Sequence, residues 1–310
     1  MRLGGAALAV SLLAACGTTT GTASRPPTGS TTSAAPTTTT TTVPPTTTTT
    51  TAPEQPGWIT ADRSALGINA DQRTIAEPDG TQIAITRFLA ARVHYALHVG
   101  SEDPPTGSAS ITALDGSIVA PQEAPILIGA FNGGFKVAAA AGGMEVLGQV
   151  LTPLENGLAS LVIDQDGSAH IGIWGQTIPV PGEAVASVRQ NLAPLVVNGA
   201  PSPSINDIAA WGATLGGGSA VARSALGIDA QGNLLYAGSM SAVPADLANA
   251  LIAAGAVTAL ELDINPYWVQ VDTSPTPGAP LVAGVPGQQR PANQFSVGWT
   301  RDFVTVLSNG

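Results

Sequence analysis

The sequence predicts an α+β fold, in which one mixed β-sheet domain with a few packed helices follows a disordered Thr/Pro-rich stalk. The first observation is a sharp change of composition: residues 17–56 are almost wholly Thr, Pro, Ser, Ala and Gly. The second is a series of alternating apolar segments separated by glycine turns, which is typical of strands. The third is one clear helical pattern late in the chain. The roughly 250 residues after the stalk suffice for one large domain, which we place at residues 57–310.

The N-terminus predicts an export signal. Arg2 precedes an apolar run from about Ala6 to Ala15, which is too short to span a bilayer. The run Leu13-Ala14-Ala15-Cys16 resembles the lipobox of bacterial lipoproteins, which predicts a signal peptide over residues 1–15 and a diacylated Cys16. An ordinary secretory peptide with an incidental cysteine is the alternative. We therefore expect an extracytoplasmic chain that is anchored to the cell membrane only through Cys16 and faces the cell wall.

Residues 16–56 are expected to form a lipid-anchored, disordered linker. The segment has no large apolar side chains to bury, so it cannot offset the entropy cost of ordering. Beyond residue 56 the chain has nine basic and twenty acidic side chains, a net charge of about −11, which argues against a nucleic-acid surface. Cys16 is the only cysteine, so no disulfide stabilises the domain.

Five segments carry the secondary-structure prediction. Residues 92–99 alternate between apolar and polar side chains, as in a half-buried strand. Two strand–turn–strand patterns cover residues 159–174 and 225–237, each with a glycine in its turn. Residues 244–254 read as a helix that begins with proline and ends before Gly255, and a strand over residues 256–264 would complete a β-α-β unit. The octapeptide 63–70 recurs at 223–230 with one Asn/Asp change, but the flanks differ, so we infer no duplicated domain.

The densest chemical signal is the run Phe131-Asn132-Gly133-Gly134-Phe135-Lys136, which follows an apolar segment. Two glycines allow a ligand to approach the backbone closely, and Lys136 is the only lysine of the chain. A simple hairpin turn is the alternative, because Asn-Gly is a common turn signal.

The second signal is the segment 260–268, which contains Glu261, Asp263, Asn265 and Trp268. Strand alternation predicts Glu261 and Asp263 on one face, with Cα atoms roughly 6.5 Å apart. Two carboxyl groups at such a separation suit glycoside hydrolysis. A solvated acidic strand face is the alternative.

Other chemistries have little support. The glycine run before Arg223 lacks the Gly-Lys-Ser/Thr of a P-loop, although Arg223 itself suits a phosphate. No nucleophile elbow appears. His94 and His98 are separated along a strand and His170 stands alone, so we predict no metal ligands and no cofactor, with a divalent cation held by carboxylates left open.

In this order, these segments resemble the phosphodiester glycosidase family, to which the uncovering enzyme belongs. The resemblance spans roughly residues 85–307, and it also includes the runs Leu195-Val196-Val197-Asn198-Gly199 and Arg301-Asp302-Phe303. It implies an exported hydrolase that cleaves a sugar-1-phosphodiester or a related envelope glycan linkage. Asp263 would act as nucleophile or general base with Glu261 as its partner. The substrate-binding residues would be Asn132, Gly133, Gly134, Lys136, Asn198, Arg223, Asn265 and Trp268, with Arg223 and Lys136 on the phosphate.

Two departures favour an alternative function. Lys136 stands where the family typically has an aromatic residue, and Ile264-Asn265-Pro266 replaces a glycine-rich stretch. The alternatives are a non-catalytic domain that binds a cell-wall glycan and a structural envelope lipoprotein. The expected partner is a carbohydrate or sugar-phosphate of the cell envelope, and not a nucleic acid.

Overall fold

The computed structural model describes residues 57–105, 116–139, 141–212 and 217–310. The predicted signal peptide, Cys16 and the stalk lie outside these residues. The described chain is mostly β-sheet with few helices, and is therefore richer in strands than the α+β class that the sequence predicted. The reason is that many short segments between the predicted elements pair as additional strands.

The strands form three sheets in which every ladder between neighbours is antiparallel. The largest has the order β1-β2-β3-β14-β13-β15-β11-β12. Its strands are β1 (Ile59–Ser64), β2 (Gly67–Ala76), β3 (Gln82–Phe88), β14 (Leu234–Ala242), β13 (Val221–Asp229), β15 (Ala256–Asp263), β11 (Val196–Val197) and β12 (Ala200–Pro201).

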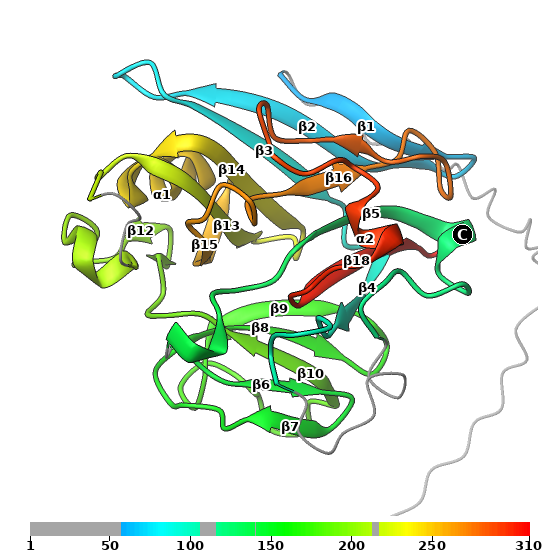
Figure 1. Cartoon of the computed structure of the whole chain (residues 1–310), viewed down its shortest axis with the longest axis horizontal. Coiled ribbons are helices and arrows are strands. Elements are labelled where there is room, and N and C mark those ends of the chain that lie inside the picture. The colour runs from blue at the N-terminus through cyan, green and yellow to red at the C-terminus, as the bar shows by residue number, and fades with distance from the viewer. Residues whose placement is uncertain (1–56, 106–115, 140, 213–216) are drawn as a thin grey trace, which may run out of the picture. The chain divides into compact units, whose positions relative to one another are not determined.

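Two five-stranded sheets complete the described fold (Figure 1). One has the order β7 (Gln149–Thr152), β6 (Met144–Val146), β10 (Val185–Gln190), β8 (Ala159–Asp164) and β9 (Ala169–Ile173). The other has the order β17 (Val282–Ala283), β16 (Val271–Thr273), β5 (Leu127–Asn132), β18 (Phe303–Ser308) and β4 (Val93–His98).

Helices are short. Among the described residues they are α1 (Pro244–Ala253), α2 (Gln294–Val297) and the 3-10 turns Ala124–Ile126, Val137–Ala139 and Ile208–Trp211. No helix among the described residues is long and apolar enough to cross a membrane.

The five predicted segments are confirmed at the level of secondary structure, the last of them as β15. The strand in residues 92–99 is β4, and its predicted apolar face is buried. The two strand–turn–strand patterns are β8–β9 and β13–β14, and the predicted helix is α1. Because β14 and β15 both run antiparallel to β13, which lies between them, the unit β14-α1-β15 is a crossover between parallel strands.

The main core lies where the three sheets meet. It contains Phe88 and Leu226 from the large sheet, Phe131 from β5 and Leu161 from β8. A second core forms where α1 packs its Leu247 against the other face of the large sheet. The central strands β13 and β15 are therefore buried on both faces, which explains their nearly continuous apolar sequences.

Candidate functional site

The ends of strands from two sheets meet around a tightly closed pocket, whose free volume for a water-sized molecule is about 0 Å³. β5 ends there at Asn132, β15 ends there at Asp263, and the residues just before β18 close it. The lining residues are Asn132, Gly133, Gly134, Asp263, Trp268, Trp299, Arg301 and Asp302. The first five of these were predicted as site residues from the sequence, so the structure brings them together.

Asp263 and Arg301 form a buried ion pair in this pocket. Arg301 Nη1 donates to Asp263 Oδ2 at 2.7 Å, and a second guanidinium nitrogen donates to the carbonyl oxygen of Gly134. Burial raises the pKa of Asp263, although the charge of Arg301 opposes this effect. Trp268 lies against the same guanidinium, with 5.1 Å from Arg301 Cζ to the ring centroid. The pocket thus combines a carboxylate, a cation and an aromatic face.

The two glycines are required because other side chains occupy the space that a Cβ would need. A Cβ on Gly133 would lie 1.8 Å from Asp302 Oδ2, and one on Gly134 would lie 1.9 Å from Asn191 Oδ1. Asp302 in turn accepts hydrogen bonds from Arg189 Nε at 2.8 Å and from the backbone N–H of Gly134 at 3.2 Å. The Gly-Gly turn therefore lies directly on a second buried ion pair.

The side chain of Asn132 makes four hydrogen bonds within the protein. Its Nδ2 donates to Gly133 O and to Ser224 Oγ, and its Oδ1 accepts from Tyr236 Oη at 2.8 Å and from Gln270 N at 3.2 Å. This side chain holds the end of β5 against β13, β14 and β16. Any contact with a ligand would come in addition to these four hydrogen bonds.

Glu261 does not face Asp263, contrary to the prediction from strand alternation. In the β13–β15 register Ser224 lies opposite Asp263 and Ala225 lies opposite Glu261, so one residue of β15 is skipped. Opposed residues share a face and successive residues alternate, so this irregularity turns Asp263 to the opposite face from Glu261. The expected carboxyl pair is not formed.

Glu261 is instead the fully buried partner of Arg223. Arg223 Nη1 donates to Glu261 Oε1 at 2.7 Å and to the carbonyl oxygen of Trp211 at 3.1 Å, while Nε and Nη2 donate to the carbonyl oxygens of Ala242 and Ser219. Burial raises the pKa of Glu261 to about 8 in spite of the guanidinium. The predicted phosphate-binding role of Arg223 does not suit these surroundings, because both side chains are inaccessible to solvent.

Three further predicted residues lie outside the pocket. Lys136 is exposed just beyond the Gly-Gly turn. Asn265 caps its own turn, since its backbone N–H donates to Asp263 Oδ1 and its Oδ1 accepts from Tyr267 N. Asn198, at φ 52°, lies in another cavity. The pocket residues that sequence reasoning did not assign are Trp299, Arg301 and Asp302, although the run Arg301-Asp302-Phe303 was part of the family resemblance.

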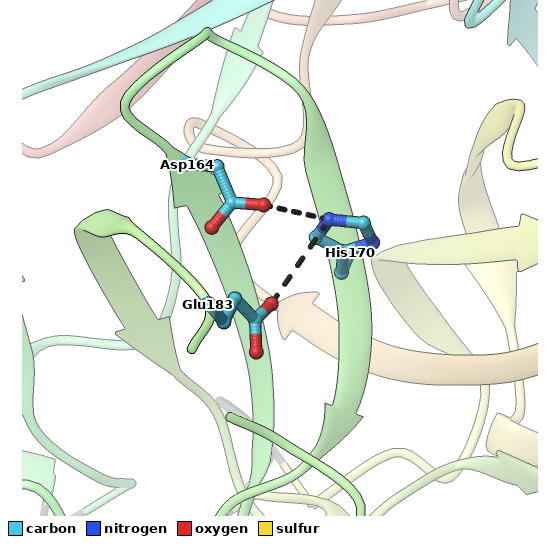
Figure 2. Close-up of side chains that lie close together, drawn as sticks. All are labelled: Asp164, His170 and Glu183. Atoms are coloured by element: carbon cyan, nitrogen blue, oxygen red, sulfur yellow. Dashed lines mark hydrogen bonds and ion pairs between the residues drawn. The ribbon is translucent and has the colours of Figure 1, made fainter. Parts of the chain in front are cut away.

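The cavity that contains Asn198 has a volume of about 750 Å³ and lies between β9 and the large sheet. His170 lies in its wall with two carboxylates. His170 Nε2 is 2.8 Å from Asp164 Oδ2 and 4.0 Å from Glu183 Oε1 (Figure 2). The sequence interpretation that His170 stands alone was therefore wrong, because Glu183 reaches it from a loop thirteen positions further along the chain.

Comparisons with known proteins give only distant structural similarity. No protein-family model matches the chain, and no curated protein matches its sequence. Among solved structures, the catalytic domain of zebrafish N-acetylglucosamine-1-phosphodiester alpha-N-acetylglucosaminidase, auto-inhibited by its pro-peptide, is 14% identical with a TM-score of 0.49; the match covers 82% of this chain and 88% of that one.

Two bacterial structures are similar at the same level. A hypothetical protein from Synechocystis is 12% identical with a TM-score of 0.44, covering 77% of this chain and 62% of its own. A candidate exported protein from Burkholderia pseudomallei is 12% identical with a TM-score of 0.42, covering 78% and 75%. Similarity at this level identifies neither the family nor the activity of the chain.

Proposed function

We propose that the chain is an exported hydrolase that cleaves a sugar-1-phosphodiester or a related envelope glycan linkage in the pocket of Asp263 and Arg301. The observation that carries the proposal is the position of Asp263, Arg301 and Trp268 in one pocket beside the Gly-Gly turn. Cleavage of a sugar C1–O bond develops positive charge at the sugar and leaves a phosphate. The carboxylate and the aromatic face suit the positive charge at the sugar, and the guanidinium suits the phosphate.

Asp263 is the proposed nucleophile or general base. Its raised pKa makes it a stronger base than an exposed carboxylate once it is ionised. Arg301 takes over the phosphate-binding role that the sequence suggested for Arg223, because Arg301 lines the pocket and Arg223 does not. Because the departing phosphate is a weak base, no strong general acid is needed beside Asp263.

The small size of the pocket requires a side chain to move. Sites for small molecules usually have volumes of about 300–1,000 Å³, whereas the free volume of this pocket is about 0 Å³. Trp268 is half-buried and contacts Trp299 edge to face at 5.2 Å between ring centroids. Rotation of Trp268 away from Trp299 is the proposed way to admit a sugar.

The test uses the purified full chain with a panel of sugar-1-phosphodiesters, followed by phosphorus NMR. The matched control for Asp263→Asn is Asp71→Asn, because Asp71 also forms a buried ion pair with an arginine, Arg87, but on β2 and β3. We expect a phosphate monoester with the unmodified chain and with Asp71→Asn, and a rate lower by about 10²–10⁴-fold with Asp263→Asn. Equal rates for Asp263→Asn, with both variants folded, would remove Asp263 from the chemistry.

A second candidate is glycan binding without turnover. Tyr267 is 53% exposed beside the pocket, and the guanidinium of Arg290 lies 5.6 Å from its ring centroid and 5.5 Å from that of Trp268. An aromatic surface of this kind suits the apolar face of a sugar ring. Saturable binding on a glycan array, without any product in the NMR assay, would favour this candidate. Tyr267→Ala should abolish this binding, and Asp263→Asn should leave it unchanged.

We also propose that the chain is anchored to the outer face of the cell membrane through a lipidated Cys16. The support is the lipobox-like run before Cys16 and the stalk composition that follows it. Cell fractionation should find the unmodified chain with the membrane and Cys16→Ser in the soluble fraction, and mass spectrometry should find a diacylated N-terminal peptide only in the former. A membrane-bound Cys16→Ser chain would contradict the proposal.

A further inference from the structure

We propose that Asp164, His170 and Glu183 form a binding site for a divalent transition-metal ion, with Zn²⁺ as the ion that best fits the donor set. The site lies in the wall of the 750 Å³ cavity, away from the pocket of Asp263 and Arg301. The proposal is independent of the hydrolase activity proposed above.

Three different segments supply the three ligand atoms. Asp164 is the last residue of β8, His170 lies on β9, and Glu183 belongs to the loop that leads into β10. The two strands pair directly, and the Asp164–Gly167 turn that joins them is fixed by a backbone hydrogen bond of 2.9 Å. Figure 2 shows both carboxylates directed at the same edge of the imidazole ring.

The distances suit one small cation. One nitrogen or oxygen atom from each side chain lies within 4.8 Å of the other two. Tetrahedral zinc with bonds of about 2.0–2.1 Å places its ligand atoms roughly 3.3 Å apart. The separations of 2.8 Å and 4.0 Å at His170 Nε2 bracket that value, so rotations of the side chains alone would complete the geometry.

Burial and charge provide a second line of support. Asp164 Oδ1 is buried and has no hydrogen-bond partner among the described residues, and only 6% of the Glu183 side chain is exposed. The residues that line the cavity include no lysine or arginine. Two largely buried carboxylates without a lysine or arginine nearby are costly unless a cation neutralises them.

The orientation of the ligands is partly fixed by neighbouring donors. The backbone N–H of Val180 donates to Glu183 Oε2 at 2.6 Å, which leaves Oε1 directed at His170. Hydrogen bonds of this kind around a metal ligand hold it in position and raise metal affinity. Three protein ligands leave one position of a tetrahedral ion for water or a ligand in the cavity.

An alternative explanation of the same geometry is a protonated His170 between two carboxylates, without any metal. Imidazolium would then supply the neutralising charge. Metal binding distinguishes the two, because an ion pair that needs no cation predicts no zinc uptake at this cluster.

The test is equilibrium dialysis of the chelator-treated full chain against Zn²⁺, with the metal measured by mass spectrometry. Every protein carries Cys16→Ser, because a free thiol would itself bind zinc. His94→Ala is the matched control, since His94 also lies on a strand, β4, but its Nδ1 pairs with Asn309 outside the cluster. Circular dichroism checks the fold of each protein.

We expect one zinc per chain in the parent and in His94→Ala, and an affinity at least tenfold lower in His170→Ala and in the isosteric Asp164→Asn. Co²⁺ in place of zinc should give the strong visible absorption of four-coordinate cobalt, and this signal should disappear in the same two variants. Absence of zinc uptake by the folded parent at about 100 µM, or equal uptake by His170→Ala, would overturn the proposal. Loss of uptake in His94→Ala would equally overturn it, by assigning the binding to a surface histidine.

Discussion

Arg301 and Asp263 pair at 2.7 Å although they belong to different sheets: Asp263 ends β15 of the large sheet, and Arg301 precedes β18 of a five-stranded sheet. The pair therefore joins the two sheets at the site where the Gly-Gly turn enters. Its role in stability can be measured separately from its proposed role in catalysis.

Arg301→Ala should destabilise the fold by about 3–5 kcal/mol, because it leaves the carboxylate of Asp263 buried without its cation. The double variant Arg301→Ala/Asp263→Asn should lose less than the sum of the two single variants. Urea unfolding measures all three free energies. Arg92→Ala is the control, since Arg92 is only half-buried and makes a weak 3.4 Å contact with Ser64. A loss for Arg301→Ala no greater than that of the control would contradict the prediction.

The stability of the fold should depend on the protonation of Asp272. Burial raises the pKa of Asp272 from its ordinary value of 3.8 to about 7, and its partners Gln270 and Gln288 are neutral amides. Between about pH 4 and pH 7 the folded chain keeps this proton while the unfolded chain releases it, so the contribution of Asp272 to stability falls as the pH rises.

Asp272→Asn removes this dependence. We expect the difference in unfolding free energy between this variant and the unmodified chain to change by roughly 1 kcal/mol per pH unit across that window, in favour of the variant at higher pH. Urea unfolding at pH 4, 5, 6, 7 and 8 measures the difference. A constant difference at all five pH values would show that the pKa of Asp272 is not raised.

Gly133→Ala and Gly134→Ala should each disrupt the pocket, because the new Cβ would overlap Asp302 or Asn191. Each should cost more than about 3 kcal/mol and abolish any activity that depends on Asp263, since either the Arg189–Asp302 pair or Asn191 must move. Gly218→Ala is the matched control, because the nearest atoms to its Cβ lie at 3.6 Å and its φ is not positive. Thermal unfolding compares the three variants. Similar melting temperatures for all three would contradict the steric explanation.

Local patterns predicted the strands and the main helix well. Alternation in residues 92–99 and the proline–glycine boundaries of residues 244–255 depend on neighbours in sequence, and the structure confirms both as β4 and α1. The sequence also singled out Gly133 and Gly134 as a place of close approach, although it expected a ligand there and the structure places Asp302 and Asn191 against them. The sequence prediction underestimated the strand content, since short strands such as β11 and β16 form only when a partner strand is available.

The candidate site was predicted only in part. Five residues of the pocket were named, but Arg301 and Asp302 come from a segment whose position depends on the pairing of β18 with β5. The predicted pairing of Glu261 with Asp263 failed because a register irregularity against β13 turned the two side chains to opposite faces. Nothing in the sequence of β15 alone indicates such an irregularity.

The repeated octapeptide separates what the sequence determined from what the tertiary structure decided. Composition determined an acidic segment after a Thr/Pro-rich one, and local patterns determined the main regular elements within it. The sequence did not determine the conformation of the repeat. In residues 63–70 the chain ends β1, turns at Ala65 and Leu66 and begins β2, with Leu66 58% exposed, whereas residues 223–229 lie within one continuous strand, with Leu226 fully buried. In the first copy, Gly67 adopts φ 129° and the chain turns. In the second copy, β13 pairs with β14 on one side and with β15 on the other. These two ladders, together with the burial of Leu226, outweigh the local preference for a turn.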